Sequence, residues 1–223
     1  MKKVIILGTG GTALDILDVL RDLNVQAKNP LYSCIGFLDD DKSKWDKEYF
    51  GVKVLTSLAK ASDFDDAYFI NGIGNADNFW KKEGIIAKTK ISTDRFLTII
   101  HPTASVSTTA ILGKGTVVFQ QATIAVNASI GNHVVILPGS IVSHDVSIGD
   151  YSCITGGVSI SGRVRIEKSC FLGTNSSIIG DTVIGDYAMV GMGSVVLRDV
   201  VPKTVVAGNP AGLIRKIKTK EID

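Results

Sequence analysis

Residues 124–160 read IAVNASIGNHVVILPGSIVSHDVSIGDYSCITGGVSI, and every sixth residue of this stretch is Val or Ile. The series runs unbroken over sixteen positions that are all Val, Ile or Leu: Val106, Leu112, Val118, Ile124, Ile130, Ile136, Val142, Ile148, Ile154, Ile160, Ile166, Leu172, Ile178, Ile184, Val190 and Val196. Only 30 of the 96 residues from 104 to 199 are of these three types. The odds of such a run by chance are therefore on the order of 10⁻⁸.

A period of six aliphatic residues predicts a parallel β-helix, in which three hexads form one triangular coil. The residue two places before each sixfold position is small or aliphatic, as at Ala104 and Val134, and Gly often follows, as at Gly113 and Gly131. Sixteen hexads correspond to about five coils, each rising roughly 4.8 Å. A β-sandwich would instead show a period of two and irregular turns.

The first hundred residues have a different composition. Residues 1–100 hold 11 of the 15 aromatic residues, whereas residues 101–223 hold 15 of the 23 Gly. Apolar runs that predict strands alternate with helical stretches, which favours a small parallel α/β sheet resembling half of a Rossmann domain. The expected strands are 3–7, 33–38, 67–72 and 96–100, and the expected helices are 13–23 and 78–88. We place the domains at 1–100 and 101–203, with a C-terminal tail at 204–223.

Composition excludes several classes of protein. A hydrophobic content of 45% excludes a disordered chain, and a net charge of +2 argues against nucleic acid as the main partner. No apolar run approaches the ~20 residues that a membrane span needs. The three Cys have no metal-ligand spacing, which fits a reducing cytoplasm without a disulfide framework.

Stacking singles out His144 as a candidate catalytic residue. Residues 18 apart lie above one another in such a helix, and the column of His144 continues with Gly162 and Gly180. We therefore expect an open, Gly-lined space beside the imidazole. Asp145 follows directly, and a neighbouring carboxylate can fix the tautomer of an imidazole and raise its basicity. These residues predict a general base, and an ordinary surface histidine is the alternative.

The other histidines and Cys153 receive plainer interpretations. His101 precedes Pro102 at the domain junction, where we expect it to cap or pack. His133 lies in a Gly-Asn turn and is expected to be solvated. His133 and His144 are eleven residues apart and lie in different columns, which argues against a zinc site with three His ligands. Cys153 precedes an inward Ile and is interpreted as a packing residue.

The N-terminal strand leads into a glycine-rich turn, Gly8-Thr9-Gly10-Gly11-Thr12-Ala13, and Asp39 follows the next strand. This pattern satisfies a dinucleotide fingerprint. About a hundred residues make only half of a dinucleotide domain, so a mononucleotide fits better than NAD. Backbone N–H groups at a helix N-terminus suit a diphosphate, and Asp39 can accept hydrogen bonds from a ribose or base. A tight turn without a ligand is the alternative.

Several motifs accompany the hexads: Val4-Ile5-Ile6-Leu7-Gly8-Thr9-Gly10-Gly11, Gly36-Phe37-Leu38-Asp39-Asp40, Gly72-Ile73-Gly74-Asn75, His101-Pro102, Ser143-His144-Asp145, Ile148-Gly149-Asp150 and Val206-Ala207-Gly208-Asn209-Pro210-Ala211. Over nearly the whole chain, this combination resembles the sugar O- and N-acyltransferases of the sialic-acid acetyltransferase type. It is most similar to bacterial nucleotide-sugar N-acetyltransferases that act on 4-amino-4,6-dideoxyhexoses in surface-glycan synthesis.

The resemblance implies a left-handed β-helix and direct acetyl transfer from acetyl-CoA, without an acyl-enzyme and without a metal. His144 matches the general base, Asp145 matches its acidic neighbour, and Gly162 matches a residue whose N–H lies near the thioester carbonyl. The positions that contact acetyl-CoA match Cys153, Thr174 and Met192. The positions that hold the nucleotide match Gly10, Gly11, Thr12, Asp39, Asp40 and Gly74. The resemblance also implies a cytoplasmic homotrimer with its active sites between subunits.

Some alternatives stay open. Relatives often carry Asn-Thr shortly before the catalytic His, whereas this chain has Leu137-Pro138-Gly139, so the sugar is undecided. O-acetylation of sialic acid or a related hydroxyl, a nicotinamide-dependent oxidoreductase and a non-catalytic β-helical scaffold are the competing functions. The basic residues near the C-terminus form a solvated face or attract the 3′-phosphate of CoA; they are Lys203, Arg215, Lys216, Lys218 and Lys220.

Overall fold

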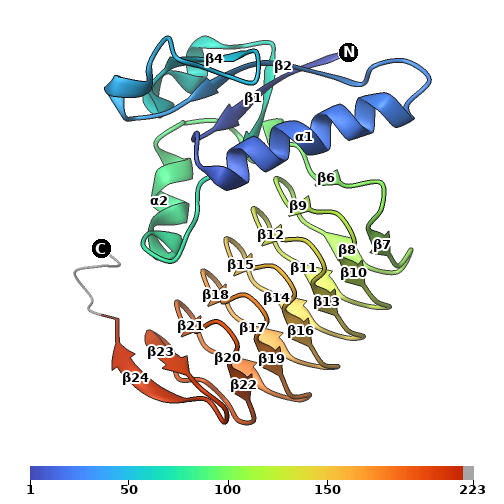
Figure 1. Cartoon of the computed structure of the whole chain (residues 1–223), viewed down its shortest axis with the longest axis vertical. Coiled ribbons are helices and arrows are strands. Elements are labelled where there is room, and N and C mark those ends of the chain that lie inside the picture. The colour runs from blue at the N-terminus through green and yellow to red at the C-terminus, as the bar shows by residue number, and fades with distance from the viewer. Residues whose placement is uncertain (218–223) are drawn as a thin grey trace.

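The computed structural model describes residues 1–217, and Lys218 and Lys220 of the basic C-terminal segment lie outside them. An α/β domain is followed by a parallel β-helix, whose coils are stacked in a regular column (Figure 1). Each coil contributes one two-residue strand to each of three sheets, as the six-residue period predicts. Strand partners are 18 residues apart, as in the pairing of Ile136 with Ile154.

The three sheets are the faces of a triangular prism. Face 1 consists of β6 (Ile99–Ile100), β9 (Val117–Val118), β12 (Val135–Ile136), β15 (Cys153–Ile154), β18 (Phe171–Leu172), β21 (Met189–Val190), β23 (Thr204–Ala207) and β24 (Gly212–Lys216). Face 2 consists of β7 (Ser105–Val106), β10 (Thr123–Ile124), β13 (Ile141–Val142), β16 (Ser159–Ile160), β19 (Ser177–Ile178) and β22 (Val195–Val196). Face 3 consists of β8 (Ile111–Leu112), β11 (Ser129–Ile130), β14 (Ser147–Ile148), β17 (Arg165–Ile166) and β20 (Val183–Ile184).

The sixfold aliphatic residues line the inside of the prism, as predicted. From Val118 to Val196 all of them are at most 2% exposed, and only Val106 and Leu112 at the first coil are partly buried. The small residues two places earlier complete the core. At Thr116, Ser140 and Ser152 the buried hydroxyl donates to a main-chain carbonyl, as in Ser140 Oγ to Thr155 O at 2.8 Å. Ser176 Oγ, by contrast, is buried without a hydrogen-bond partner in the described part of the chain. The interior is therefore closely packed, and these three hydroxyls bond to the backbone.

The N-terminal domain is a five-stranded sheet in the order β3-β4-β2-β1-β5. Its elements are β1 (Lys2–Leu7), α1 (Gly11–Gln26), β2 (Tyr32–Leu38), β3 (Glu48–Tyr49), β4 (Val52–Thr56), β5 (Ala67–Asn71) and α2 (Lys82–Ala87). Short 3₁₀ turns lie at Lys42–Lys44, Leu58–Asp63, Phe79–Lys81 and Thr93–Arg95. The strands are parallel except for the β3–β4 hairpin.

The structure differs from the sequence prediction in four places. The β3–β4 hairpin was not predicted, because its short apolar run is broken by charged residues. The expected helix 78–88 is a 3₁₀ turn followed by the short α2. The expected strand 96–100 ends in β6, which pairs with β9 on face 1, and β23 and β24 continue that face where a tail was expected.

Face 1 supports the N-terminal domain. Its outward residues are apolar, whereas faces 2 and 3 carry Ser, Thr and Arg at several equivalent positions. Phe79 lies 5.6 Å from Phe171 between ring centroids, and Lys168 Nζ forms an ion pair with Glu83 of α2 at 3.0 Å. These contacts place the N-terminal domain along face 1.

Candidate active site

His144 and Asp145 lie in the turn that follows β13, at the corner between faces 2 and 3. The His144 Nδ1 lies 2.8 Å from Asp145 Oδ2, and the imidazole is 47% exposed. The hydrogen bond from His144, followed by one from Asn127, holds the pKa of the Asp145 carboxyl below its ordinary value. With Nδ1–H bonded to this carboxylate, the Nε2 lone pair of a neutral His144 is available to accept a proton.

Gly162, one coil beyond His144, determines where the imidazole lies. A Cβ added at Gly162 would come within 2.5 Å of both His144 Cε1 and Nε2. The space that the sequence predicted to be open is thus occupied by the ring itself, which lies against the Gly162 backbone. The neighbouring residues Ser161 and Arg163 donate their backbone N–H groups to Ile178 O and His144 O. Within residues 1–217 no such backbone bond is found for the Gly162 N–H.

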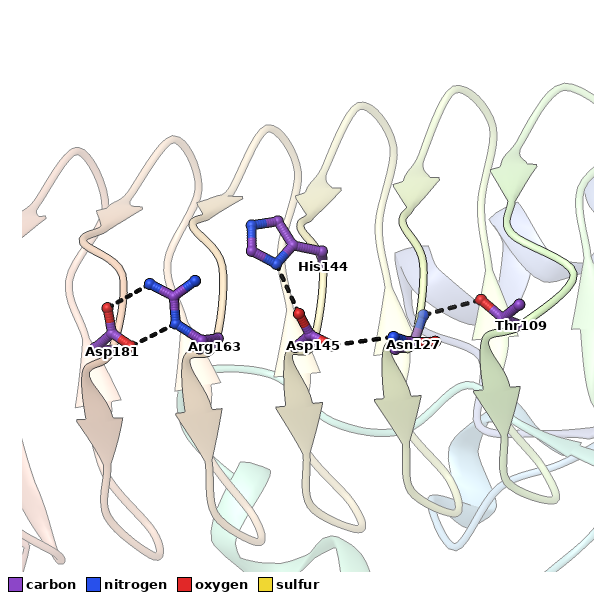
Figure 2. Close-up of polar contacts among 6 residues, drawn as sticks. All are labelled: Thr109, Asn127, His144, Asp145, Arg163 and Asp181. Atoms are coloured by element: carbon purple, nitrogen blue, oxygen red, sulfur yellow. Dashed lines mark hydrogen bonds and ion pairs between the residues drawn. The ribbon is translucent and has the colours of Figure 1, made fainter.

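A polar ladder runs along the same corner, one residue per coil (Figure 2). Asn127 Nδ2 donates to Asp145 Oδ1 at 3.2 Å. On the other side, Arg163 binds Asp181 through two hydrogen bonds of 2.7 and 2.8 Å. His144 and Asp145 therefore lie between two fixed polar groups, of which only the Asn127 amide contacts the Asp145 carboxylate.

The N-terminal domain contains a pocket of about 280 Å³ where β1 and β5 end and α1 begins. It is lined by Gly8, Thr9, Gly10, Gly11, Thr12, Asp39, Lys44, Gly72, Ile73, Gly74, Asn75 and Asn78. Gly10 is the N-cap of α1, with no side-chain cap and no acidic residue in the first turn. The helix N-terminus therefore leaves N–H groups free for an anion. A Cβ at Gly72 would lie 2.6 Å from Ala13, so only Gly allows α1 to approach this edge.

Asp39 is held in place on one side of the pocket. Its carboxylate accepts hydrogen bonds from Thr9 Oγ1 at 2.5 Å, the Asp41 N–H at 2.9 Å and Lys44 Nζ at 3.1 Å. Partial burial raises the pKa of Asp39, but the bonds from Thr9, Asp41 and Lys44 outweigh it, so the pKa lies below its ordinary value. Asp39 is thus a fixed anionic acceptor, suited to ribose or base hydroxyl and amino groups.

Asp40 is not part of this pocket. Its Oδ1 accepts the Leu58 N–H at 3.0 Å, at the start of the 3₁₀ turn Leu58–Asp63, and its Oδ2 lies 3.9 Å from Lys88 Nζ. The remaining residues that the resemblance assigns to the nucleotide line the pocket together: Gly10, Gly11, Thr12, Asp39 and Gly74. In this structure Asp40 therefore stabilises the start of the 3₁₀ turn Leu58–Asp63.

Gly74 connects the pocket to face 1. A Cβ at Gly74 would lie 3.3 Å from both Cys153 Sγ and Lys82 Cδ. Cys153 is 4% exposed and packs with Phe79 and Phe171, in agreement with its interpretation as a packing residue. Lys82 is fully buried, with its Nζ 3.7 Å from Cys153 Sγ. Burial lowers the pKa of Lys82, and no sequence signal pointed to this residue.

The prediction that His133 is solvated is wrong. His133 is 3% exposed, because its turn faces the N-terminal domain rather than water. Its ring stacks on Tyr151 at 5.4 Å and meets Phe96 edge-on at 4.6 Å. Burial lowers the pKa of His133 to about 4, and its Nδ1 has no hydrogen-bond partner in the described part of the chain.

His101 packs at the domain junction, as predicted. It is 7% exposed, and its two ring nitrogens lie 2.9 Å from Asp22 Oδ2 and 2.9 Å from Thr103 Oγ1. Residues 1–217 contain no group of three or more His, Cys, Asp or Glu side chains arranged to hold a metal ion.

A second pocket of about 410 Å³ lies at the C-terminal end of the β-helix, and its lining includes Arg198, Leu213 and Lys216. Arg198 lies in the column of His144, three coils further along.

None of the helices within residues 1–217 is long and apolar enough to cross a membrane.

Within one chain, the predicted site residues are distributed over three places. His144, Asp145 and Gly162 lie at the corner between faces 2 and 3. Thr174 and Met192 lie at the corner between faces 1 and 2, where Met192 is 78% exposed. Cys153 lies on face 1, and the pocket lies in the N-terminal domain that packs along face 1. Because the corner between faces 2 and 3 is opposite face 1 in a triangular prism, a single chain does not bring His144 to the pocket.

Comparison with known proteins gives two family matches. A bacterial transferase hexapeptide model matches residues 127–162 and 163–198, and a PglD N-terminal domain model matches residues 3–82. A curated relative, the UDP-N-acetylbacillosamine N-acetyltransferase of Bacillus subtilis, is 34% identical over 124 residues. That alignment covers 53% of this chain and about half, 51%, of the relative.

Solved structures resemble the whole fold. PerB from Caulobacter crescentus, in complex with CoA and GDP-perosamine, has a TM-score of 0.81 at 26% identity, covering 96% of this chain and 98% of that one. The acetyltransferase domain of PglB from Neisseria gonorrhoeae, in complex with acetyl coenzyme A, has a TM-score of 0.82 at 25% identity, covering 96% and 99%.

The fold is thus a left-handed β-helix of hexapeptide repeats that follows an α/β domain. The two family models together match residues 3–82 and 127–198, so the chain is similar to hexapeptide-repeat transferases with a PglD-type N-terminal domain.

Proposed function

We propose that this protein transfers the acetyl group of acetyl-CoA to the amino group of a nucleotide-linked 4-amino-4,6-dideoxy sugar, in the cytoplasm and as a homotrimer. The observation that carries the proposal is the pairing of His144 Nδ1 with Asp145 at 2.8 Å, which leaves Nε2 as a proton acceptor beside the Gly162 backbone. The N-terminal pocket adds a helix N-terminus for a diphosphate and a fixed acceptor, Asp39, for the nucleoside.

In the reaction, the sugar amine attacks the thioester carbonyl while His144 Nε2 takes the amine proton. The N–H of Gly162 donates to the oxygen that becomes negatively charged. The tetrahedral intermediate collapses, the carbon–sulfur bond breaks, and the proton passes from His144 to the departing sulfur. Asp145 stabilises the imidazolium that exists between these two proton transfers. No group of the protein is acylated.

The separation of the site residues supports the assembly. If the corner of His144 in one subunit faces face 1 of the next, His144 reaches a pocket that its own chain does not offer it. The exposed corner of Thr174 and Met192 then borders the same cleft, where acetyl-CoA lies between two subunits. Three identical contacts close a ring with three sites.

Hybrid trimers test this arrangement. We mix the variants His144→Ala and Asp39→Ala after dissociation and reassembly, and assay them at a nucleotide-sugar concentration low enough that the weakened binding of Asp39→Ala leaves it almost inactive alone. A site between subunits needs an intact His144 from one chain and an intact Asp39 from the next, so random mixing restores about a quarter of the wild-type sites. A site within one chain restores none. Sedimentation adds the mass, expected near three times the 23.7 kDa of the chain.

Thiol release from acetyl-CoA, measured against UDP-, GDP- and dTDP-linked 4-amino sugars, identifies the acceptor. Sialic acid and a 4-hydroxy sugar nucleotide are included because Leu137-Pro138-Gly139 leave the acceptor side open. Release with an amino sugar that disappears in His144→Ala supports the proposal. Release with hydroxyl acceptors alone assigns O-acetylation instead. Turnover retained by His144→Ala contradicts the general-base role.

A further inference from the structure

The corner that carries His144 presents one polar side chain per coil in a single line: Thr109, Asn127, Asp145, Arg163 and Asp181 (Figure 2). Asn127, Asp145, Arg163 and Asp181 all have backbone φ angles between 57° and 63°. The same left-handed conformation in successive coils makes these side chains project from the corner alike. Within this line, each side chain therefore lies next to the one before it and the one after it.

A hydrogen bond from Asn127 orients the carboxylate of Asp145. One carboxylate oxygen, Oδ2, accepts from His144 Nδ1, and the other, Oδ1, accepts from Asn127 Nδ2 at 3.2 Å. Asn127 is itself anchored, because its backbone N–H donates to Thr109 Oγ1 at 3.0 Å. The carboxylate is thereby oriented toward the imidazole by a neutral donor that brings no charge of its own.

Arg163 lies one coil from Asp145 and one coil from Asp181, so its guanidinium could pair with either carboxylate. It binds Asp181, with Nε and a terminal nitrogen 2.7 and 2.8 Å from the two carboxylate oxygens. A two-pronged guanidinium–carboxylate contact is strong and directional. Had Arg163 turned to Asp145, it would compete with His144 for the same carboxylate and place a positive charge beside the imidazolium.

We propose that Asn127 and Asp181 are positioning residues for acetyl transfer: Asn127 orients the Asp145 carboxylate on His144, and Asp181 keeps the Arg163 guanidinium away from it. The charged and titratable groups that face Asp145 are His144 and Arg163, and those that face Asp181 are Arg163 and His144. This inference rests on the proposed function of His144. Its test, however, follows the protonation of the His144 ring and requires no substrate.

The test measures the titration midpoint of the His144 imidazole by NMR in the full-length protein, with His144→Ala identifying its signals. Asn127→Gly removes the amide while a glycine keeps the left-handed backbone unstrained. Gln121→Gly is the matched control, because Gln121 has a φ of 58° and its backbone N–H also donates to a threonine hydroxyl, Thr103 Oγ1.

We expect Asn127→Gly to move the titration midpoint of His144 to lower pH, because the Asp145 carboxylate is no longer held toward the imidazolium. The expected shift is about half a unit, the size of an exposed charged contact, and kcat/KM falls about threefold. Gln121→Gly leaves both unchanged. Equal midpoints in Asn127→Gly and wild type overturn the role of Asn127, even where kcat/KM falls, because a merely structural role does not move the midpoint.

Asp181 is tested by rescue. Asp181→Gly, which keeps the left-handed backbone unstrained, frees Arg163, so the midpoint again moves to lower pH by about half a unit. The double variant Asp181→Gly/Arg163→Gly removes the competing guanidinium and returns the midpoint to the wild-type value. A double variant that stays as low as Asp181→Gly, or an Asp181→Gly without a shift, overturns the role of Asp181. Because the midpoint is read without substrate, a failure to find turnover with any acceptor contradicts the proposed function and leaves this result intact.

Discussion

Replacing Gly162 by Ala tests whether the position of the His144 ring sets the rate. The added Cβ would lie 2.5 Å from His144 Cε1 and Nε2 and 3.1 Å from Nδ1. Ordinary van der Waals contact begins near 3.4 Å, so the ring must move by about 0.9 Å. The imidazole is 47% exposed and can tilt toward solvent, away from the atoms with which Nε2 exchanges a proton.

A displacement of about 1 Å at a reacting group costs on the order of 10²-fold in rate. We therefore expect kcat of Gly162→Ala to fall about a hundredfold, while stability changes little because Gly162 does not need a left-handed φ. Thiol release from acetyl-CoA gives kcat, and thermal unfolding gives stability. Gly212→Ala is the control, since a Cβ there meets no heavy atom within 4 Å.

The result that refutes this reasoning is a folded Gly162→Ala with wild-type kcat while His144→Ala is inactive. His144 would then act as a base from a displaced position, and close contact with Gly162 would have no importance for catalysis.

Three further predictions concern the pocket and the domain interface. Asp39→Ala removes the fixed acceptor and weakens nucleotide binding in calorimetry at least tenfold, whereas Asp40→Ala keeps binding and lowers stability by about 1 kcal/mol, as loss of a helix cap does. The folded-state pKa of His133, about 4, lies below its unfolded value near 6.5, so the unfolded chain binds the extra proton. Stability from this group is therefore complete above pH 6.5 and falls by up to about 3 kcal/mol as the pH drops to 4. Denaturation of His133→Phe should show a flatter pH dependence over that range. The buried Lys82 also has a lowered pKa, so wild-type stability rises with pH toward the unfolded value of about 10.4. Lys82→Met abolishes that rise, and an unchanged slope just below about pH 10.4 would contradict the assignment.

The β-helix was predictable because its signal is redundant. Each inward position, such as Ile136 or Ile154, faces copies of itself one coil away, so one steric demand is repeated sixteen times in the sequence. The pairing of His144 with Asp145 was equally predictable, since both residues lie in one turn. The β3–β4 hairpin and the short α2 were harder to predict, because elements of a few residues depend on the neighbours against which they pack.

Sequence alone determined the period, the inward residues and the column in which Gly162 follows His144. Only the tertiary structure decided which face of the prism packs against the N-terminal domain. That decision buried His133 and Lys82, which are polar in sequence but enclosed by Phe96, Tyr151 and Cys153 in space. It also placed the pocket of the N-terminal domain on the side of face 1, opposite the corner of His144. The physical reason is that a repeat specifies contacts between residues 18 apart, whereas the docking of the domain depends on surfaces that no period in the chain encodes.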